Sequence, residues 1–76
     1  MSAYGVALFH TTSAALRSEK LAKQAGLRVK LIPVPRQLSS DCGISLRFGW
    51  QDEAVVRQLL ADAGVDVVSY AKLDKR

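Results

Sequence analysis

Cysteine and histidine are almost absent from this 76-residue chain, which has one of each, Cys42 and His10. A single cysteine excludes an internal disulfide, a metal site built from several cysteines, and a dithiol redox centre, which needs a second, resolving cysteine. We therefore expect no bound metal and no cofactor. A chain without disulfides is typical of a reducing compartment, so we expect a cytoplasmic protein.

Long hydrophobic runs are also missing. No apolar stretch approaches the roughly 20 residues that a membrane span needs, and residues 1–4 lack the basic region and apolar run of a signal peptide. We expect no membrane association. With 49% hydrophobic residues, two prolines and five glycines, the composition is that of a folded protein. A chain of this length has room for one domain, residues 1–76.

Acidic residues are fewer than basic ones, 7 against 11, which gives a net charge of +4. A basic surplus favours nucleic acid as a partner. However, three of the basic residues fall within positions 72–76, and no block of Lys and Arg with interleaved aromatics is present. We therefore do not expect nucleic acid to be the principal partner.

Hydrophobic periodicity predicts six elements. Runs of β-formers or alternating apolar and polar residues predict strands at 4–10, 27–32, 44–48 and 65–70. Apolar residues at helical spacing predict one helix after the alcohols at 11–13 that ends at Gly26, and another from Asp52 to Gly64. Leu16 falls on the polar side of the first helix, where self-association into a homo-oligomer would explain it. Residues 72–76 are predicted to fray.

The order β-α-β-β-α-β predicts an α+β protein of the ferredoxin-like, split βαβ type, with an antiparallel sheet and two helices on one face. Ala25-Gly26 and Ala63-Gly64 each close a predicted helix before a strand, which indicates two related halves. Another α+β sandwich with the same order of elements is the alternative.

This topology predicts where the single cysteine lies. The end of the first strand, the start of the first helix and the loop of residues 36–43 meet at one end of the sheet. Cys42 would then face a helix N-terminus, whose positive potential favours a thiolate. His10 and Arg36 would act in the same direction, whereas Asp41 would oppose them.

Several kinds of chemistry are open to a lone thiol. A cysteine hydrolase needs a base fixed by a third group, and so short a chain leaves little wall for a substrate cleft. A carrier needs an exposed nucleophilic sulfur, donors for an anionic persulfide and a docking surface. Ser39, Ser40, Gly43 and the alcohols Thr11, Thr12 and Ser13 could supply the donors. The alternative is a buried, inert cysteine.

The stretch from Phe9 to Phe48 resembles the Se/S carrier protein-like family of small bacterial domains. The resemblance is strongest in PVPRQLSSDCGI, residues 33–44, and includes the alcohols at 11–13, Ala15-Leu16, Glu19-Lys20 and Gly26. It implies that Cys42 accepts sulfur or selenium, flanked by Pro35, Arg36, Ser39, Ser40 and Gly43. The cysteine-proline motif of TusA-like sulfur carriers is missing, so their partners do not transfer directly.

These residues predict a carrier that takes a persulfide or selenopersulfide on Cys42 from a donor such as a cysteine desulfurase and passes it to an acceptor enzyme. Such a protein turns over nothing alone. One alternative is a non-catalytic binding module for a small or regulatory ligand, which the same fold often provides. The other is an RNA-binding domain, which needs aromatic side chains on an exposed sheet face. Phe48, which shares a face with Ile44 and Leu46, is expected in the core instead.

Overall fold

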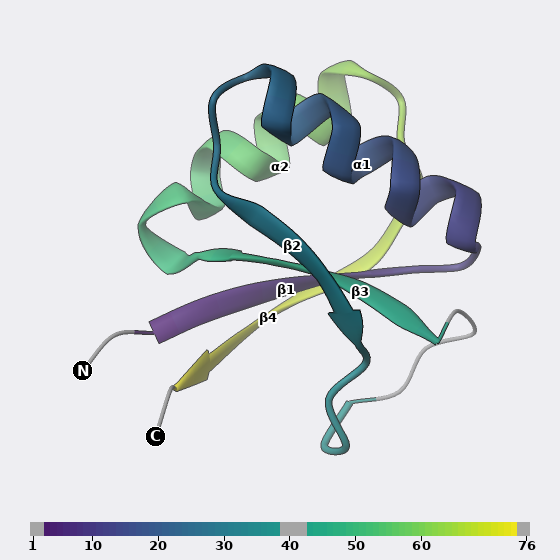
Figure 1. Ribbon diagram of the computed structural model, residues 1–76, viewed down its shortest axis with the longest axis vertical. Helices are drawn as coiled ribbons and strands as arrows, with labels where there is room; N and C mark the ends of the chain where they lie inside the picture. The colour runs from purple at the N-terminus through teal and green to yellow at the C-terminus, as the bar shows by residue number, and fades with distance from the viewer. Residues whose placement is uncertain (1–2, 39–42, 75–76) are drawn as a thin grey trace.

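The part of the chain that the structure describes folds into four strands and two α-helices in the predicted order (Figure 1). The computed structural model describes residues 3–38 and 43–74. Its elements are β1 (Ala3–Phe9), α1 (Thr12–Gln24), β2 (Val29–Pro33), β3 (Ile44–Gly49), the 3₁₀ turn η1 (Trp50–Asp52), α2 (Glu53–Asp62) and β4 (Val67–Asp74).

The four strands form one antiparallel sheet in the order β2-β3-β1-β4. Strand β1 is central and pairs with both β3 and β4, whereas β2 pairs with β3 at the edge. Both helices cover the same face of this sheet (Figure 1). The predicted ferredoxin-like, split βαβ fold is thereby confirmed.

The core lies between the sheet and the two helices. Alternate residues of β1 and β3 point into it and meet buried side chains of α1 and α2. The fully buried members are Ala7, Phe9, Ala15, Leu46, Phe48, Val56 and Leu60. The opposite face is not wholly exposed, because Val6 and Leu8 are also buried. Phe48 was expected in the core from its alternation with Leu46, and its 1% exposure confirms this.

Small side chains bring α1 close to the sheet. Ala15, Ser18 and Ala22 are the buried positions of this helix, as its predicted apolar face required. The Ser18 hydroxyl donates to the carbonyl oxygen of Ala14 at 2.8 Å, which satisfies it inside the core. Leu16, the residue that the helical pattern placed on the polar side, is 51% exposed.

Both helices end in the same hydrogen-bonded motif. In α1 the N–H of Leu27 donates to Ala22 O and that of Gly26 to Lys23 O, both at 3.0 Å. In α2 the corresponding bonds run from Val65 to Leu60 and from Gly64 to Ala61. These are Schellman caps, which need a left-handed residue, and Gly26 and Gly64 have φ of 83° and 72°. The sequence repeat therefore encodes a structural repeat.

Several predicted boundaries were wrong. Strand β2 begins at Val29 rather than Leu27, because the N–H of Leu27 belongs to the α1 cap. Strand β4 covers Val67–Asp74 rather than 65–70, and residues 72–74, predicted to fray, pair with the start of β1. Asp52 stands before α2 without a side-chain cap hydrogen bond, because η1 runs directly into that helix. Val55, an apolar residue of α2, is 51% exposed.

Candidate functional site

The loop between β2 and β3, residues 34–43, has a well-defined base. The ladder of β2 and β3 ends at the pair Pro33 and Ile44, and the N–H of Val34 then donates to Gly43 O at 3.2 Å. A turn follows at once, because the N–H of Leu38 donates to Pro35 O at 3.0 Å. Pro35 is the first residue of this turn, and Arg36 and Gln37 occupy its two central positions.

Two of the residues assigned to the site from sequence lie on the described part of this loop. Arg36 and Gly43 are both exposed. Ser39, Ser40, Asp41 and Cys42 lie outside the described residues. The structure therefore describes Leu38 and Gly43, the residues on either side of the segment that contains the cysteine.

The residues assigned from the end of β1 lie at the start of α1. His10, Thr11 and Thr12 are exposed. Thr11 is the N-cap of α1, as predicted for this group of alcohols, and its hydroxyl oxygen accepts from the N–H of Ala14 at 3.1 Å. No acidic residue lies in the first turn of α1. The positive potential of this helix end is thus not neutralised by its own first turn.

Strand register brings these two regions to the same end of the sheet. Ser45 of β3 pairs with Ile32 on one side and with Leu8 on the other. The end of β1, the end of β2 and the start of β3 therefore lie in line, and the start of α1 follows β1 directly (Figure 1). Arg36 and His10 belong to segments that leave the sheet at this end. The arrangement brings one arginine, one histidine and the N-terminus of a helix to this end of the sheet.

Comparison with protein-family models agrees with this geometry. The model described as "Putative Se/S carrier protein-like" matches residues 4–72. The chain belongs to this family. No curated protein and no solved structure matches the chain. The family match covers β1 to β4, whereas the sequence resemblance stopped near Phe48, so the second helix and last strand are also family features.

The described residues of this Se/S carrier-like chain contain neither a helix fit to span a membrane nor a cluster of metal ligands. Neither helix there has the length and hydropathy of a membrane-spanning segment. No three His, Cys, Asp or Glu side chains of residues 3–38 and 43–74 converge on a position that could hold a metal ion.

The face of the sheet opposite the helices is poorly suited to stacking bases. Phe9 and Phe48 are buried on the helix side, and Trp50 stacks against Phe48 with a centroid distance of 6.3 Å. Among the described strand residues, Tyr4 is the one aromatic on the opposite face, and the Arg47 guanidinium lies 4.2 Å from the centre of its ring. RNA recognition by an aromatic platform therefore has little support.

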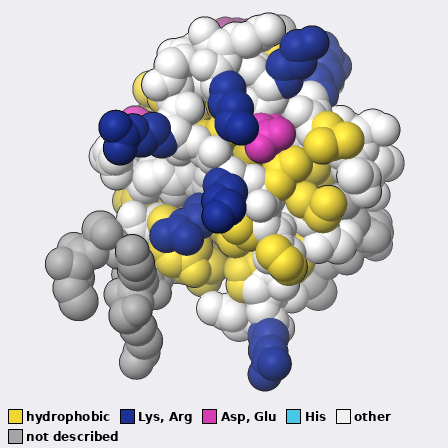
Figure 2. All heavy atoms as spheres, viewed as in Figure 1, with side chains coloured by type: hydrophobic (Ala, Val, Ile, Leu, Met, Phe, Trp, Pro, Cys, Tyr) yellow, Lys and Arg dark blue, Asp and Glu magenta, His cyan; other side chains and the backbone are white. Residues whose placement is uncertain are grey.

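Sequence patterns did not reveal a cavity of about 520 Å³ at the other end of the sheet. Its lining includes four cations, Lys23, Arg28, Lys30 and Arg47. The alternation of residues 27–31 indicated a basic strand face, but nothing linked it to Lys23 or Arg47. Figure 2 shows Lys and Arg side chains gathered over α1 and β2, with hydrophobic surface between them.

Proposed function

We propose that the protein carries sulfur or selenium on Cys42. The main support is the family match over residues 4–72, in a chain whose only cysteine lies in the stretch where the sequence resemblance to that family is strongest. In the proposed reaction the Cys42 thiolate attacks the terminal sulfur of a donor enzyme's persulfide. The S–S bond of the donor breaks as a new S–S bond forms, and the donor's cysteine leaves as a thiolate.

The second half-reaction is the same exchange in reverse direction. An acceptor's thiolate attacks the terminal atom on Cys42, and the Cys42 thiolate is regenerated without any net oxidation. A cysteine desulfurase is the proposed donor class, and the acceptor is an enzyme that uses the delivered atom. Two partners must dock in turn, so the cysteine has to be accessible from outside the protein.

The neighbours of Cys42 support this role in two ways. Gly43 follows it directly in the chain and fixes one end of its segment through the hydrogen bond to Val34. Arg36 and the N-terminus of α1 supply positive potential at the same end of the sheet, which favours an anionic persulfide, and His10 lies at the same end. Ser39, Ser40 and Thr12 are proposed as further hydrogen-bond donors to it.

The direct test is loading by a cysteine desulfurase. We expect incubation with the desulfurase and cysteine to raise the intact mass by one sulfur atom, and reductant to reverse the change. The variant Cys42→Ser should not load. Failure of the parent protein to load under conditions that load another carrier, or loading that persists in Cys42→Ser, would contradict the proposal.

A relocated thiol separates a specific site from general thiol chemistry. In Cys42→Ser with Lys20→Cys, the only thiol stands on the exposed surface of α1, away from the β2–β3 loop. We expect this variant to load at least about tenfold more slowly and to react more slowly with iodoacetamide at about pH 7. Equal rates would mean that the surroundings of Cys42 contribute nothing.

A further inference from the structure

We propose that the cavity lined by Lys23, Arg28, Lys30 and Arg47 binds a small polyphosphate anion, meaning a molecule with two or more linked phosphoryl groups. The cavity borders the start of β2 and the end of β3, where Val29 pairs with Phe48. The β2–β3 loop leaves the opposite ends of these strands, roughly 17 Å away at about 3.3 Å per residue. The proposed site therefore lies at the other end of these strands from the β2–β3 loop.

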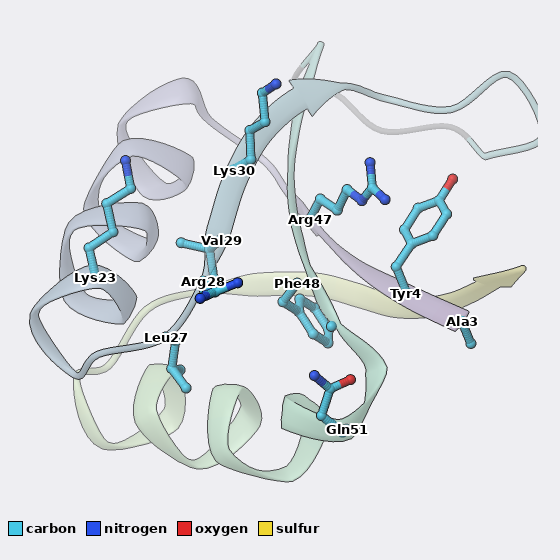
Figure 3. Close-up of a pocket in the computed structure, with 11 residues that line it drawn as sticks. Ala3, Tyr4, Lys23, Leu27, Arg28, Val29, Lys30, Arg47, Phe48 and Gln51 are labelled. Carbon is cyan, nitrogen blue, oxygen red and sulfur yellow. The ribbon is translucent and has the colours of Figure 1, made fainter. Parts of the chain in front are cut away.

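Charge is the first ground for this proposal. The cavity is lined by four basic side chains and, among the described residues, by no Asp or Glu. A concave site lined by one sign of charge concentrates the electrostatic potential and attracts ions of the opposite sign. Figure 3 shows Lys23 on the α1 side, Arg28 and Lys30 along β2, and Arg47 extending toward Tyr4.

The second ground is a like-charge pair within the sheet. Lys30 and Arg47 are direct cross-strand partners, and like charges placed opposite each other destabilise a sheet. The positive charge of Arg47 is partly compensated by its contact with the Tyr4 ring. Lys30 and Arg28 have no ion pair with any described residue. An anion bound near Lys30 and Arg47 would reduce the repulsion between these two cross-strand partners.

The backbone fixes the positions of two of the cations. The Schellman cap at Gly26 sets Lys23 in the last turn of α1 and turns the chain so that Arg28 follows two residues later. The same cap occupies the carbonyl oxygens of Ala22 and Lys23, which would otherwise repel an anion. Lys23 also contacts Glu19 at 3.2 Å, where Lys23 is exposed and Glu19 is half-buried, so this pair contributes only modestly.

The size and lining of the cavity favour a small molecule over an acidic protein surface. A volume of about 520 Å³ lies within the range of small-ligand pockets. Leu27, Val29 and Phe48 add apolar surface beside the cations, and low polarity strengthens charge interactions. Two arginines can each bind phosphate oxygens through paired N–H groups. Four cations around one cavity match several linked phosphoryl groups better than a single carboxylate.

The test uses inorganic triphosphate and ATP as probes, with calorimetry and amide chemical shifts as readouts. We expect saturable binding at low salt, with shifts concentrated at residues 23, 27–30 and 47–49. Arg28→Glu should weaken it by at least about tenfold. Lys20→Glu, with the same change in charge on an exposed α1 residue outside the cavity, should weaken it much less. Lys30→Glu, at a second exposed residue that lines the cavity, should weaken binding as Arg28→Glu does.

Four outcomes would overturn the proposal. The first is no saturable binding of either probe below about 1 mM. The second is an equal loss in Arg28→Glu and Lys20→Glu, which would indicate only a general response to net charge. The third is shifts centred on residues 11–13, which would place the anion at the α1 N-terminus. The fourth is tighter binding of a hexaglutamate peptide at the same residues, which would make the occupant an acidic polypeptide. Loading of Cys42 with sulfur is measured separately and depends on none of these results.

Discussion

Gly5 is the position where a single added atom would disturb the core most directly. It lies on the helix side of β1, opposite Phe48 in the sheet. A Cβ atom there would lie 2.6 Å from Cε2 and Cζ of Phe48 and 2.8 Å from Cε3 of Trp50. Both rings are held in a stack, so they cannot move independently.

We therefore expect Gly5→Ala to lower the free energy of unfolding by about 1 to 3 kcal/mol through overpacking, measured by urea denaturation. Gly43→Ala is the matched control, because a Cβ at Gly43 meets nothing within 4 Å and its φ is not positive. That variant should change stability by less than about 0.5 kcal/mol. A stable Gly5→Ala protein would mean that the Phe48–Trp50 stack yields easily.

Tyr70 links protonation to stability. Burial raises the pKa of Tyr70 above its ordinary value of 10.0, while Arg57 lowers it and Glu53 raises it further. The Arg57 guanidinium lies 4.4 Å from the centre of the Tyr70 ring and also pairs with Glu53. Because the folded protein holds the phenol proton more tightly than the unfolded chain, the contribution of Tyr70 is complete below about pH 10 and is lost as the pH rises above it.

The expected result is a steeper loss of stability in the parent protein than in Tyr70→Phe between about pH 9 and about pH 11. The measurement is a series of urea unfolding curves across this range. Phenylalanine keeps the edge contact with Phe48, whose centroid distance is 6.4 Å, so the two proteins should differ mainly in slope. Parallel curves would show that the phenol does not couple to folding.

At the scale of the elements, the start of α1 depends on one hydroxyl. Thr11 caps this helix through the Ala14 N–H, and its backbone carbonyl accepts from Ala15 at 3.3 Å. We expect Thr11→Ala to lower the free energy of unfolding by about 1 kcal/mol. Thr11→Ser should lower it much less, because serine retains the oxygen that accepts the hydrogen bond. Thermal or urea unfolding measures both. Equal losses in the two variants would point to the lost methyl group instead.

The periodic elements could be predicted from sequence because their signals are local. Thr11 and Gly26 mark the ends of α1 through hydrogen bonds that reach at most five residues along the chain. Strand β4 was ended too early because the alternating run of residues 71–74 is short and was assigned mostly to a fraying terminus. They extend as a strand because they pair with Ala3–Val6, more than 60 positions away, and such pairing has no local signature.

At the scale of the whole molecule, the elements share one hydrophobic cluster. The radius of gyration of the protein is 11.1 Å, close to the roughly 11.4 Å expected of a compact 76-residue chain. Arg17 of α1 also donates to the Ala63 carbonyl at the end of α2, at 3.0 Å. The two βαβ halves are therefore tied together both by the shared sheet and by their helices.

We expect unfolding in a single step, because no element has a separate core to keep it folded. Trp50 fluorescence, which reports on the Phe48 stack, and far-ultraviolet circular dichroism, which reports on the helices, should give the same urea midpoint. A fluorescence midpoint clearly below that of the dichroism would show that the β1–β3 side opens first.

The candidate carrier site could be located from sequence to the level of a segment. A single cysteine in the motif of residues 33–44, with alcohols after the first strand, predicted both Cys42 and the end of the sheet that its loop leaves. The register at Ser45 confirms the end of the sheet that this loop leaves, whereas Cys42 lies outside the described residues and its role stays a proposal. The elements beside the described ends of that loop depend on the topology, and the strand order β2-β3-β1-β4 decided between the ferredoxin-like fold and another α+β sandwich with the same order of elements.

The cavity at the other end could not be predicted in this way. Lys23, Arg28, Lys30 and Arg47 come from a helix, a cap, an edge strand and an inner strand, and each alone has the sequence signature of a solvated basic residue. Short-range hydrogen bonding and hydrophobic periodicity act between near neighbours in the chain, so the sequence alone was enough for the order of the elements and for the glycine caps that end both helices. The role of Cys42 stays a proposal. Register acts between distant strands, and only the folded sheet brought these four charges around one cavity.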